Sequence, residues 1–237
     1  DDPDGNGLIN LADGTEVAVS DILDPDTTET YELGLKTSLM DNRVILSSAI
    51  FRTNWEGLPL SAQTVTRLSR VFLNTGKAAV EGVELEMHAR LSESLAANFG
   101  ISYIESKLAK DAPSLGGVKG EKLPGSADFN FNLGLEYQFA IGEYDSFVRA
   151  DYAYVGEYVH VFKANVVEGA PESGGYGLVN LKAGIDMDAV SLDLFVNNLT
   201  NADDFTWVDN IFTAFEGTNK AYRLKPRTVG LNVSYRF

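Results

Sequence analysis

The acidic stretch near the start of the chain has the oxygen-donor spacing of a calcium-binding loop. Residues 2–13 read DPDGNGLINLAD, which places Gly7 at the tight turn in position 6 of a twelve-residue loop. The predicted calcium ligands are Asp2, Asp4, Asn6, the carbonyl of Leu8, and Asp13. An ordinary solvated Asp/Gly loop is the alternative, since Asp13 stands where a bidentate glutamate is usual and no flanking helix is expected. The sequence therefore predicts a structural calcium ion that the fold does not require.

Histidines and nucleophiles give no catalytic arrangement. The chain has two histidines, His88 on the polar side of an expected strand and His160 at the edge of a loop, and it has no cysteine. A lone imidazole with no serine or carboxylate partner in the pattern is typical of a surface residue. The sequence also contains no glycine-rich phosphate loop, zinc-ligand spacing or nucleophile elbow. We therefore predict no catalytic residue, no enzyme activity and no required cofactor.

The net charge of −15 argues against nucleic acid as a partner. Binding to phosphates needs a surplus of lysine and arginine on some face, and the sequence has no basic cluster. No apolar run reaches the roughly 18 residues of a membrane-spanning helix either. A nucleic-acid-binding protein and a helical membrane protein are both disfavoured.

Alternating apolar and polar residues define the elements that must position the charged side chains. At the C-terminus Phe237, Tyr235 and Val233 fall on one face of a strand, with polar or small residues on the other. A period of two is the pattern of a strand with one apolar face. Strands are expected at residues 28–40, 43–58, 68–91, 95–108, 125–140, 145–159, 174–187, 190–200 and 221–237, the third of them as one long strand or as two with a bend at 74–76. The chain is predicted to be all-β.

Connections between the expected strands alternate in length. Tight turns are expected at 41–42, 92–94, 141–144 and 188–189, and long polar connections at 59–67, 109–124, 160–173 and 201–220. Transmembrane barrels have short periplasmic turns and long extracellular loops. A soluble β-sandwich is the alternative, but its strands have roughly 5–6 residues, whereas a tilted membrane-crossing strand needs at least about 9–11. The expected strands are long enough to cross, so we predict a transmembrane antiparallel β-barrel.

Charged side chains on the polar face of the strands fit a wet barrel lumen better than a dry sandwich core. Arg149 and Glu84 are examples; either could contact a plug or a substrate, and the simpler interpretation is a paired, hydrated wall residue. Aromatic residues also gather at or near the long connections, where they could stack on a ligand or merely pack the loops. They are Trp55, Phe205, Trp207, Phe212 and Phe215.

Several ordered motifs resemble the C-terminal part of the barrel of TonB-dependent outer-membrane transporters. The motifs are ETYELGLK at 29–36, NTGKA at 74–78, GVELE at 82–86, LPG at 123–125, NNLTN at 197–201, PRT at 226–228 and the terminal aromatic Phe237. Each is weak alone, but their order and spacing match that family from residue 28 onward. The resemblance implies a barrel of about 22 strands, of which this chain would supply the last ones.

The resemblance also implies a function and partners. Such receptors carry out energy-coupled uptake of a scarce ligand, such as iron–siderophore, cobalamin or carbohydrate, and the alternatives are a passive porin or an outer-membrane enzyme. The implied partners are outer-membrane lipid and lipopolysaccharide, the barrel assembly machinery, the remaining strands and plug, and the TonB complex acting through the plug. The sequence contains no plug or TonB box, so we expect a fragment, or a split receptor completed by a second chain.

The alternation of turns and loops predicts an orientation in the bacterial outer membrane. If the chain ends in the periplasm, counting back through the connections places residues 1–27 outside the cell as an acidic loop, and residues 28–237 form barrel strands. The expected strand number is odd, whereas bacterial barrels have an even number, which again indicates an incomplete barrel. Val233, Tyr235 and Phe237 resemble the C-terminal signal for barrel assembly; a plain lipid-facing strand end is the alternative.

Overall fold

A computed structural model describes residues 2–11, 14–18, 23–66, 69–165, 173–209 and 220–237 of the chain. In these ranges the structure is antiparallel β-sheet with two single-turn 3-10 helices, Pro113–Leu115 and Lys163–Asn165. No helix among the described residues is long and apolar enough to span a membrane. The all-β prediction is confirmed.

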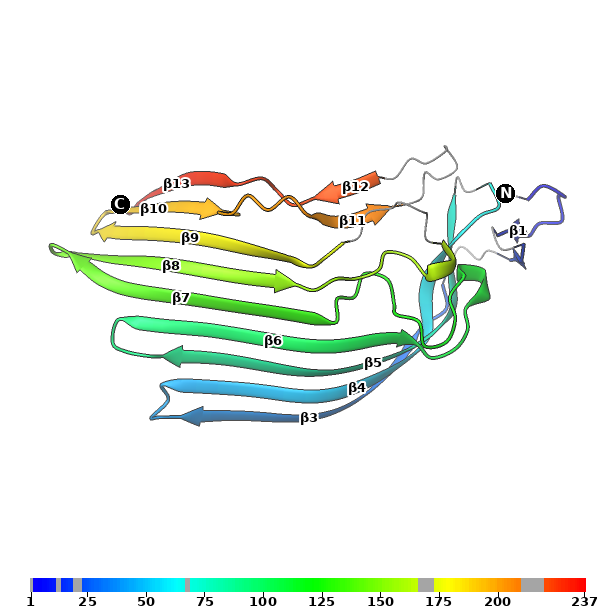
Figure 1. The fold of residues 1–237 in the computed structure, drawn as a ribbon, viewed down its shortest axis with the longest axis horizontal. Coiled ribbons are helices and arrows are strands. Elements are labelled where there is room, and N and C mark those ends of the chain that lie inside the picture. Colours follow the sequence, from blue (N-terminus) through cyan, green and yellow to red (C-terminus); the bar gives the residue numbers. More distant parts are fainter. Residues whose placement is uncertain (1, 12–13, 19–22, 67–68, 166–172, 210–219) are drawn as a thin grey trace.

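Nine strands form one continuous, curved antiparallel sheet (Figure 1). In spatial order they are β13 (Thr228–Tyr235), β10 (Val190–Asn197), β9 (Tyr176–Met187), β8 (Tyr144–Val155), β7 (Phe129–Ile141), β6 (Leu95–Leu108), β5 (Arg70–Arg90), β4 (Val44–Gln63) and β3 (Thr27–Leu39). Two small hairpins are separate from this sheet: β1 (Ile9–Asn10) with β2 (Glu16–Val17), and β11 (Phe205–Asp209) with β12 (Lys220–Arg223). The edge strands β3 and β13 lie on opposite sides of the sheet, which is therefore open.

Tight turns join the strands at one end of the sheet and long connections join them at the other, as the sequence predicts (Figure 1). The turn between β3 and β4 has Met40, Asp41 and Asn42 at positive φ, and Asp188 has a positive φ between β9 and β10. Short polar residues such as Asp and Asn tolerate this left-handed conformation, which explains three of these four positions.

Three of the predicted strand and loop ranges are wrong, because pairing between strands and a proline decide where these strands begin and end. Residues 59–67 were expected to be a loop, but β4 continues to Gln63 and pairs with β5 across two register shifts. The expected loop 201–220 contains β11. The expected strand 221–237 is divided into β12 and β13 at Pro226, since proline cannot donate to a ladder and β12 pairs with β11 instead.

The ladder register assigns the side chains to two faces. Leu33, Ile50, Val83 and Tyr103 are directly opposite one another on β3 to β6, so all four lie on the same face. These large apolar side chains are strongly exposed, with Leu33 at 76%. We call this surface the apolar face; its neighbours in sequence point to the other side, the polar face. An apolar face of this extent must be covered, and lipid covers it in a membrane barrel.

The main buried core lies at the long-loop end rather than within the sheet. Leu11, Ala62, Leu108, Ala112, Leu115 and Phe162 form it. These residues come from the N-terminal segment, the extended end of β4, the end of β6, the 109–128 connection and the 156–175 connection. Burying them together ties the long connections into one packed cap.

Three phenylalanines on the polar face each lie over a glycine of the neighbouring strand. Phe51 covers Gly82, Phe147 covers Gly184 and Phe195 covers Gly230. At Gly184 a Cβ atom would lie 2.3 Å from Phe147 Cε1 and 2.5 Å from Asp193 Oδ1. Because glycine has no side chain, the phenylalanine ring can lie flat against the sheet backbone. Any other residue at the glycine position would place a Cβ atom in the space that the ring occupies.

We predict that Gly184→Ala destabilises the sheet by about 1–3 kcal/mol, because the new methyl group displaces the Phe147 ring or Asp193. The measurement is the urea midpoint of the intact barrel containing this segment. Gly34→Ala is the matched control: it also faces the polar side, and its Cβ would meet Glu32 and Ser48 only at ordinary distances of 3.5 and 3.6 Å. Equal midpoints for the two variants would contradict the prediction.

Candidate functional site

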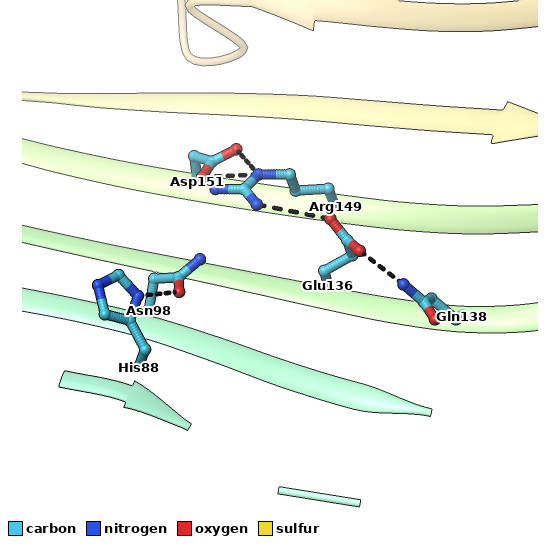
Figure 2. Close-up of polar contacts among 6 residues, drawn as sticks. All are labelled: His88, Asn98, Glu136, Gln138, Arg149 and Asp151. Atoms are coloured by element: carbon cyan, nitrogen blue, oxygen red, sulfur yellow. Dashed lines mark hydrogen bonds and ion pairs between the residues drawn. The ribbon is translucent and has the colours of Figure 1, made fainter. Parts of the chain in front are cut away.

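The polar face of the sheet carries a network of charged and amide side chains (Figure 2). On β7 and β8 the guanidinium of Arg149 donates to both oxygens of Asp151, with Nε–Oδ2 and Nη2–Oδ1 distances of 2.9 and 2.6 Å. Its Nη1 lies 3.5 Å from Glu136 Oε2, and Gln138 Nε2 donates to Glu136 Oε1 at 3.0 Å. The bidentate pair fixes the guanidinium plane against the sheet. Arg149 is thus a paired wall residue.

The network continues on both sides of Arg149. On β5 and β6, His88 Nδ1 lies 2.7 Å from Asn98 Oδ1 (Figure 2). Across β9 and β10, Lys182 Nζ lies 3.0 Å from Asp193 Oδ2 and over the Phe147 ring. Arg149, Lys182 and His88 each have an opposite charge or an amide beside them, which is typical of a hydrated lumen wall rather than of a catalytic site.

Two carboxylates on the polar face of β5 differ from this pattern. The Glu84 and Glu86 side chains are exposed, and neither carboxylate has a hydrogen bond or ion pair to any residue that the structure describes. Their register partners on β6 are Ser102 and Gly100, which offer no cation. These two charges therefore face whatever fills the lumen.

The predicted calcium loop is described except for residues 12–13, so the predicted ligand Asp13 lies outside the described residues. The Asp2 carboxylate accepts the backbone N–H groups of Asn6 and Gly7 at 3.1 and 2.9 Å, and these bonds lower the pKa of Asp2. Asn6 Nδ2 donates to Asp4 at 3.0 Å, and Leu8 N–H donates to Asn6 Oδ1 at 2.8 Å. Among the described residues no three histidine, aspartate or glutamate side chains form a metal-ligand group. Calcium binding stays a prediction.

An aromatic cluster at the long-loop end joins the 156–175 connection to the β11–β12 hairpin. The His160 ring lies edge-on to Trp207 at 5.0 Å and to Tyr158 at 5.7 Å between ring centroids. Val208 N–H donates to His160 Nδ1 at 3.3 Å, and the Tyr158 hydroxyl donates to the carbonyl of Thr206. Burial lowers the pKa of His160 below its ordinary value of 6.5, and burial raises the pKa of Tyr158. His160 is a neutral acceptor that anchors a hairpin.

The remaining predicted aromatic residues are placed separately. Trp55 on β4 donates its indole N–H to Asp26 Oδ2 at 2.5 Å. The Arg223 guanidinium lies over the Phe205 ring, 4.5 Å from the ring centroid. Phe212 and Phe215 lie outside the described residues. The contact of His160 with Trp207 and Val208 was not predicted, because no local pattern links positions almost fifty residues apart.

Comparison with known protein families identifies the family to which this sheet belongs. The family model described as TonB dependent receptor-like, beta-barrel, matches residues 3–199. The chain belongs to the TonB-dependent receptor family. Members of this family are outer-membrane transporters and receptors, not enzymes, and the predicted family and fold are confirmed. The nine-stranded open sheet is a part of such a barrel.

Among curated relatives, this TonB-dependent receptor segment is similar to the probable TonB-dependent siderophore receptor PiuA of Acinetobacter baumannii. The identity is 29% over 97 residues, which is 41% of this chain and 12% of that protein. It is also similar to the probable TonB-dependent receptor BfrD of Bordetella pertussis, with 26% identity over 116 residues, 49% of this chain and 15% of that protein.

Solved structures share the fold of this TonB-dependent receptor segment. The ferric yersiniabactin uptake receptor FyuA of Yersinia pestis has a TM-score of 0.74 at 20% identity, covering 90% of this chain and 30% of that one. The ferric-catecholate import receptor Fiu of E. coli K12 has a TM-score of 0.68 at 22% identity, covering 97% and 32%. The chain spans about a third of these receptors, so it supplies one segment of a larger wall.

The C-terminal strand of this receptor segment presents the predicted assembly residues on the apolar face. Val233 and Tyr235 are 63% and 65% exposed, and the Tyr235 and Phe237 rings are stacked with centroids 6.3 Å apart. This placement fits both the assembly signal and a plain lipid-facing strand end. A role in assembly stays a prediction.

We predict that acid loosens the β11–β12 hairpin. Because the folded-state pKa of His160 lies below 6.5, the stability that its neutral form contributes is complete above that pH and is lost as pH falls through the lower folded-state value. The measurement is hydrogen exchange of the β11 peptide at pH 7.5 and about 5, corrected for the intrinsic rate. His160→Phe keeps a ring but cannot titrate, so its pH dependence should vanish, whereas His88→Phe should retain it. Unchanged protection in acid for the wild-type receptor would contradict the assignment.

We predict that calcium binds the 2–13 loop of the intact receptor with a dissociation constant in the range of about 10⁻⁴–10⁻³ M, typical of extracellular modules. Titration calorimetry measures it, and replacing both Asp2 and Asp4 by Asn should abolish the binding heat. Asp111→Asn, which removes a carboxylate from the 109–128 connection, should leave it unchanged. Identical titrations for the wild type and the double variant would place any bound calcium elsewhere.

Proposed function

We propose that this chain forms the C-terminal barrel strands of a receptor for energy-coupled uptake of a ferric siderophore. The family match supports a TonB-dependent receptor, and the names of the relatives support the ligand class. PiuA is described as a siderophore receptor, FyuA as a ferric yersiniabactin receptor and Fiu as a ferric-catecholate receptor. One observation carries the proposal: several of the proteins to which this chain is similar are named as receptors for iron complexes, and the polar face of its sheet has the charges of a lumen wall.

The position of the lumen charges supports a plugged rather than an open lumen. Glu84 and Glu86 point from β5 toward the barrel interior without a partner among the described residues. A plug that presents lysine or arginine to them would compensate two charges that the wall leaves unpaired. In this proposal the plug lies in the part of the receptor outside this chain, and it transmits the pull of the TonB complex.

The proposed orientation places the long connections outside the cell and the tight turns in the periplasm. The cap formed around Leu11, Leu108 and Phe162 then faces the medium, as does the aromatic cluster of His160 and Trp207. A ligand arriving from outside would meet this cap first, and the lumen wall would line its path after the plug moves. The C-terminus, beyond β13, would lie at the periplasmic end.

The decisive experiment is uptake of ⁵⁵Fe supplied as siderophore complexes to cells that carry or lack the intact receptor. We expect uptake only when the receptor and a functional TonB protein are both present, because transport against a gradient requires energy coupling. Catecholate, hydroxamate and mixed-ligand complexes are compared in parallel to find the ligand class.

The controls separate the alternatives. Receptor-dependent uptake that persists without TonB would indicate a passive porin and overturn the proposal. A different result is that cells without the receptor lose TonB-dependent uptake of cobalamin or a carbohydrate but take up iron as before. This result would retain the transporter class and reject the siderophore ligand.

A further inference from the structure

Two motifs of the sequence meet at the base of the β11–β12 hairpin. The NNLTN motif at 197–201 begins in the last residue of β10, and the PRT motif at 226–228 leads into β13, which lies beside β10 in the sheet (Figure 1). The Arg227 N–H donates to Asn201 Oδ1 at 2.9 Å, and Arg227 Nη1 donates to the Leu199 carbonyl at 3.2 Å. Side chains therefore tie the end of β10 to the start of β13.

Asn198 is the buried centre of this contact, with only 4% of the residue exposed. Its Nδ2 donates to the carbonyls of Ala202 and Lys225, each at 2.9 Å, and its Oδ1 accepts the Ala202 N–H at 2.8 Å. Both donors of the amide are used. Its backbone N–H donates to Asn180 Oδ1 at 2.9 Å, which attaches the contact to β9 as well. We call the three residues of this contact the strand clamp: Asn198, Asn201 and Arg227.

The β10–β13 ladder alone does not distinguish its register from one shifted by two residues. Side chains alternate with a period of two, so such a shift leaves every residue on the same face. On the apolar face it would only exchange one aliphatic partner for another. These partners are Leu192, Leu194 and Val196 on β10 and Val229, Leu231 and Val233 on β13.

The packing of Phe195 on Gly230 is one contact that favours the observed register. A Cβ atom at the position of Gly230 would lie 2.2 Å from Phe195 Cζ. After a shift of two residues, Thr228 or Asn232 would lie opposite Phe195 instead. Either side chain would meet the ring, so a shifted register would have to displace it.

The strand clamp is the second such contact. A shift of two residues moves β13 by about 6.8 Å, which is far beyond the reach of a hydrogen bond. Lys225 and Arg227 come just before Thr228, the first residue of β13, and Pro226 between them has a fixed φ. A shift would therefore carry both residues away from the two asparagines that bind them.

The ion pair at the tight-turn end of β13 contributes less to this choice. Arg236 Nη2 lies 2.6 Å from Asp186 Oδ2, and the two side chains are 68% and 42% exposed. Exposed ion pairs stabilise a structure weakly. The register therefore depends mainly on the Phe195 ring and on the strand clamp.

We propose that the strand clamp sets the register of β13 on β10, so that Asn198 and Asn201 are positioning residues for closure of the barrel. In the complete barrel the free side of β13 pairs with another strand, and a barrel closes only with a fixed total stagger between its strands. A two-residue shift of β13 would change that stagger. The proposal uses only the membership of the chain in a barrel family, and it does not depend on what the receptor transports.

The test is disulfide trapping in the intact receptor, purified from outer membranes and oxidised with copper–phenanthroline. The variant carries four cysteines on the apolar face of a chain that has none of its own: Leu192→Cys, Leu194→Cys, Val196→Cys and Leu231→Cys. Residue 231 lies opposite 194 in the observed register and would lie opposite 192 or 196 after a shift. Diagonal neighbours, at roughly 7–8 Å between Cα atoms, are too far apart for a disulfide. Mass spectrometry of the linked peptides then gives the ratio of shifted to native register.

The comparison is made in a Phe195→Ala background, so that the clamp alone selects the register. With the clamp intact, we expect the 194–231 link to predominate. Asn198→Gly combined with Asn201→Gly removes both amides, and glycine tolerates the positive φ of 52° and 56° at these residues. The ratio of shifted to native links should rise by about thirtyfold, as expected for the loss of two net hydrogen bonds.

Asn197→Gly combined with Asn232→Gly is the matched control. It removes two amides from the polar face of the same two strands, and neither side chain has a hydrogen bond to a residue that the structure describes. The ratio should stay as it is with the clamp intact. If the Phe195→Ala receptors do not reach the outer membrane, Phe195→Leu replaces them, because it removes the flat ring but retains apolar packing.

Three outcomes would overturn the proposal. An unchanged ratio in the clamp variant would show that the clamp does not select the register. An equal rise in the control variant would indicate that added glycines loosen the ladder in general. Predominantly shifted links with the clamp intact would assign the register to the Phe195 ring alone.

Discussion

The hydrogen bonds of the nine-stranded ladder are the constraint on which the rest of the structure depends. Inside a membrane no water can satisfy backbone N–H and C=O groups, so strands cross it only when each group pairs with a neighbouring strand. Pairing fixes the register, and the register fixes which side chains meet lipid and which meet the lumen. The ladder runs from β3 to β13 through the central strands, whereas the outer sides of β3 and β13 have no partner within this sheet. Strands from the rest of the receptor must pair there for the barrel to close.

The two faces use the same kinds of residue for opposite purposes. Arg149 on the polar face is held by Asp151 and Glu136, and its neighbours are amides and further ion pairs. Arg52 on the apolar face is held by a single glutamate, Glu81. Their positions relative to the ladder explain the difference, because a one-residue shift of either strand would exchange the two environments. Aromatic residues follow the same division: Phe147 and Phe195 cover glycines on the lumen side, whereas Tyr31 and Tyr103 are exposed on the apolar face.

Local pattern predicted the central strands well and the long connections poorly. β6 begins and ends at the predicted residues, because its alternation is clear and a tight turn precedes it. The continuation of β4 to Gln63 was missed, because it depends on pairing with β5 and not on alternation within β4. The same reason applies to β11, whose partner β12 follows a segment that carries no strand pattern. The contact between His160 and Val208 also depends on this hairpin. A prediction that considers each segment alone cannot find elements that exist only as pairs.

The packed cap joins parts of the chain that lie far apart in the sequence. The long connections were expected to be polar, yet Leu11 of the N-terminal segment, Leu108 at the end of β6 and Phe162 of the 156–175 connection pack in one apolar core. Their contact joins positions far apart in the chain, so a pattern within one segment does not predict it. The same core joins the N-terminal acidic segment to the barrel, which places the predicted calcium loop beside the cap and not on a free tail. The long connections therefore meet in one packed structure, whose buried side chains come from the N-terminal segment, β4, β6 and two connections.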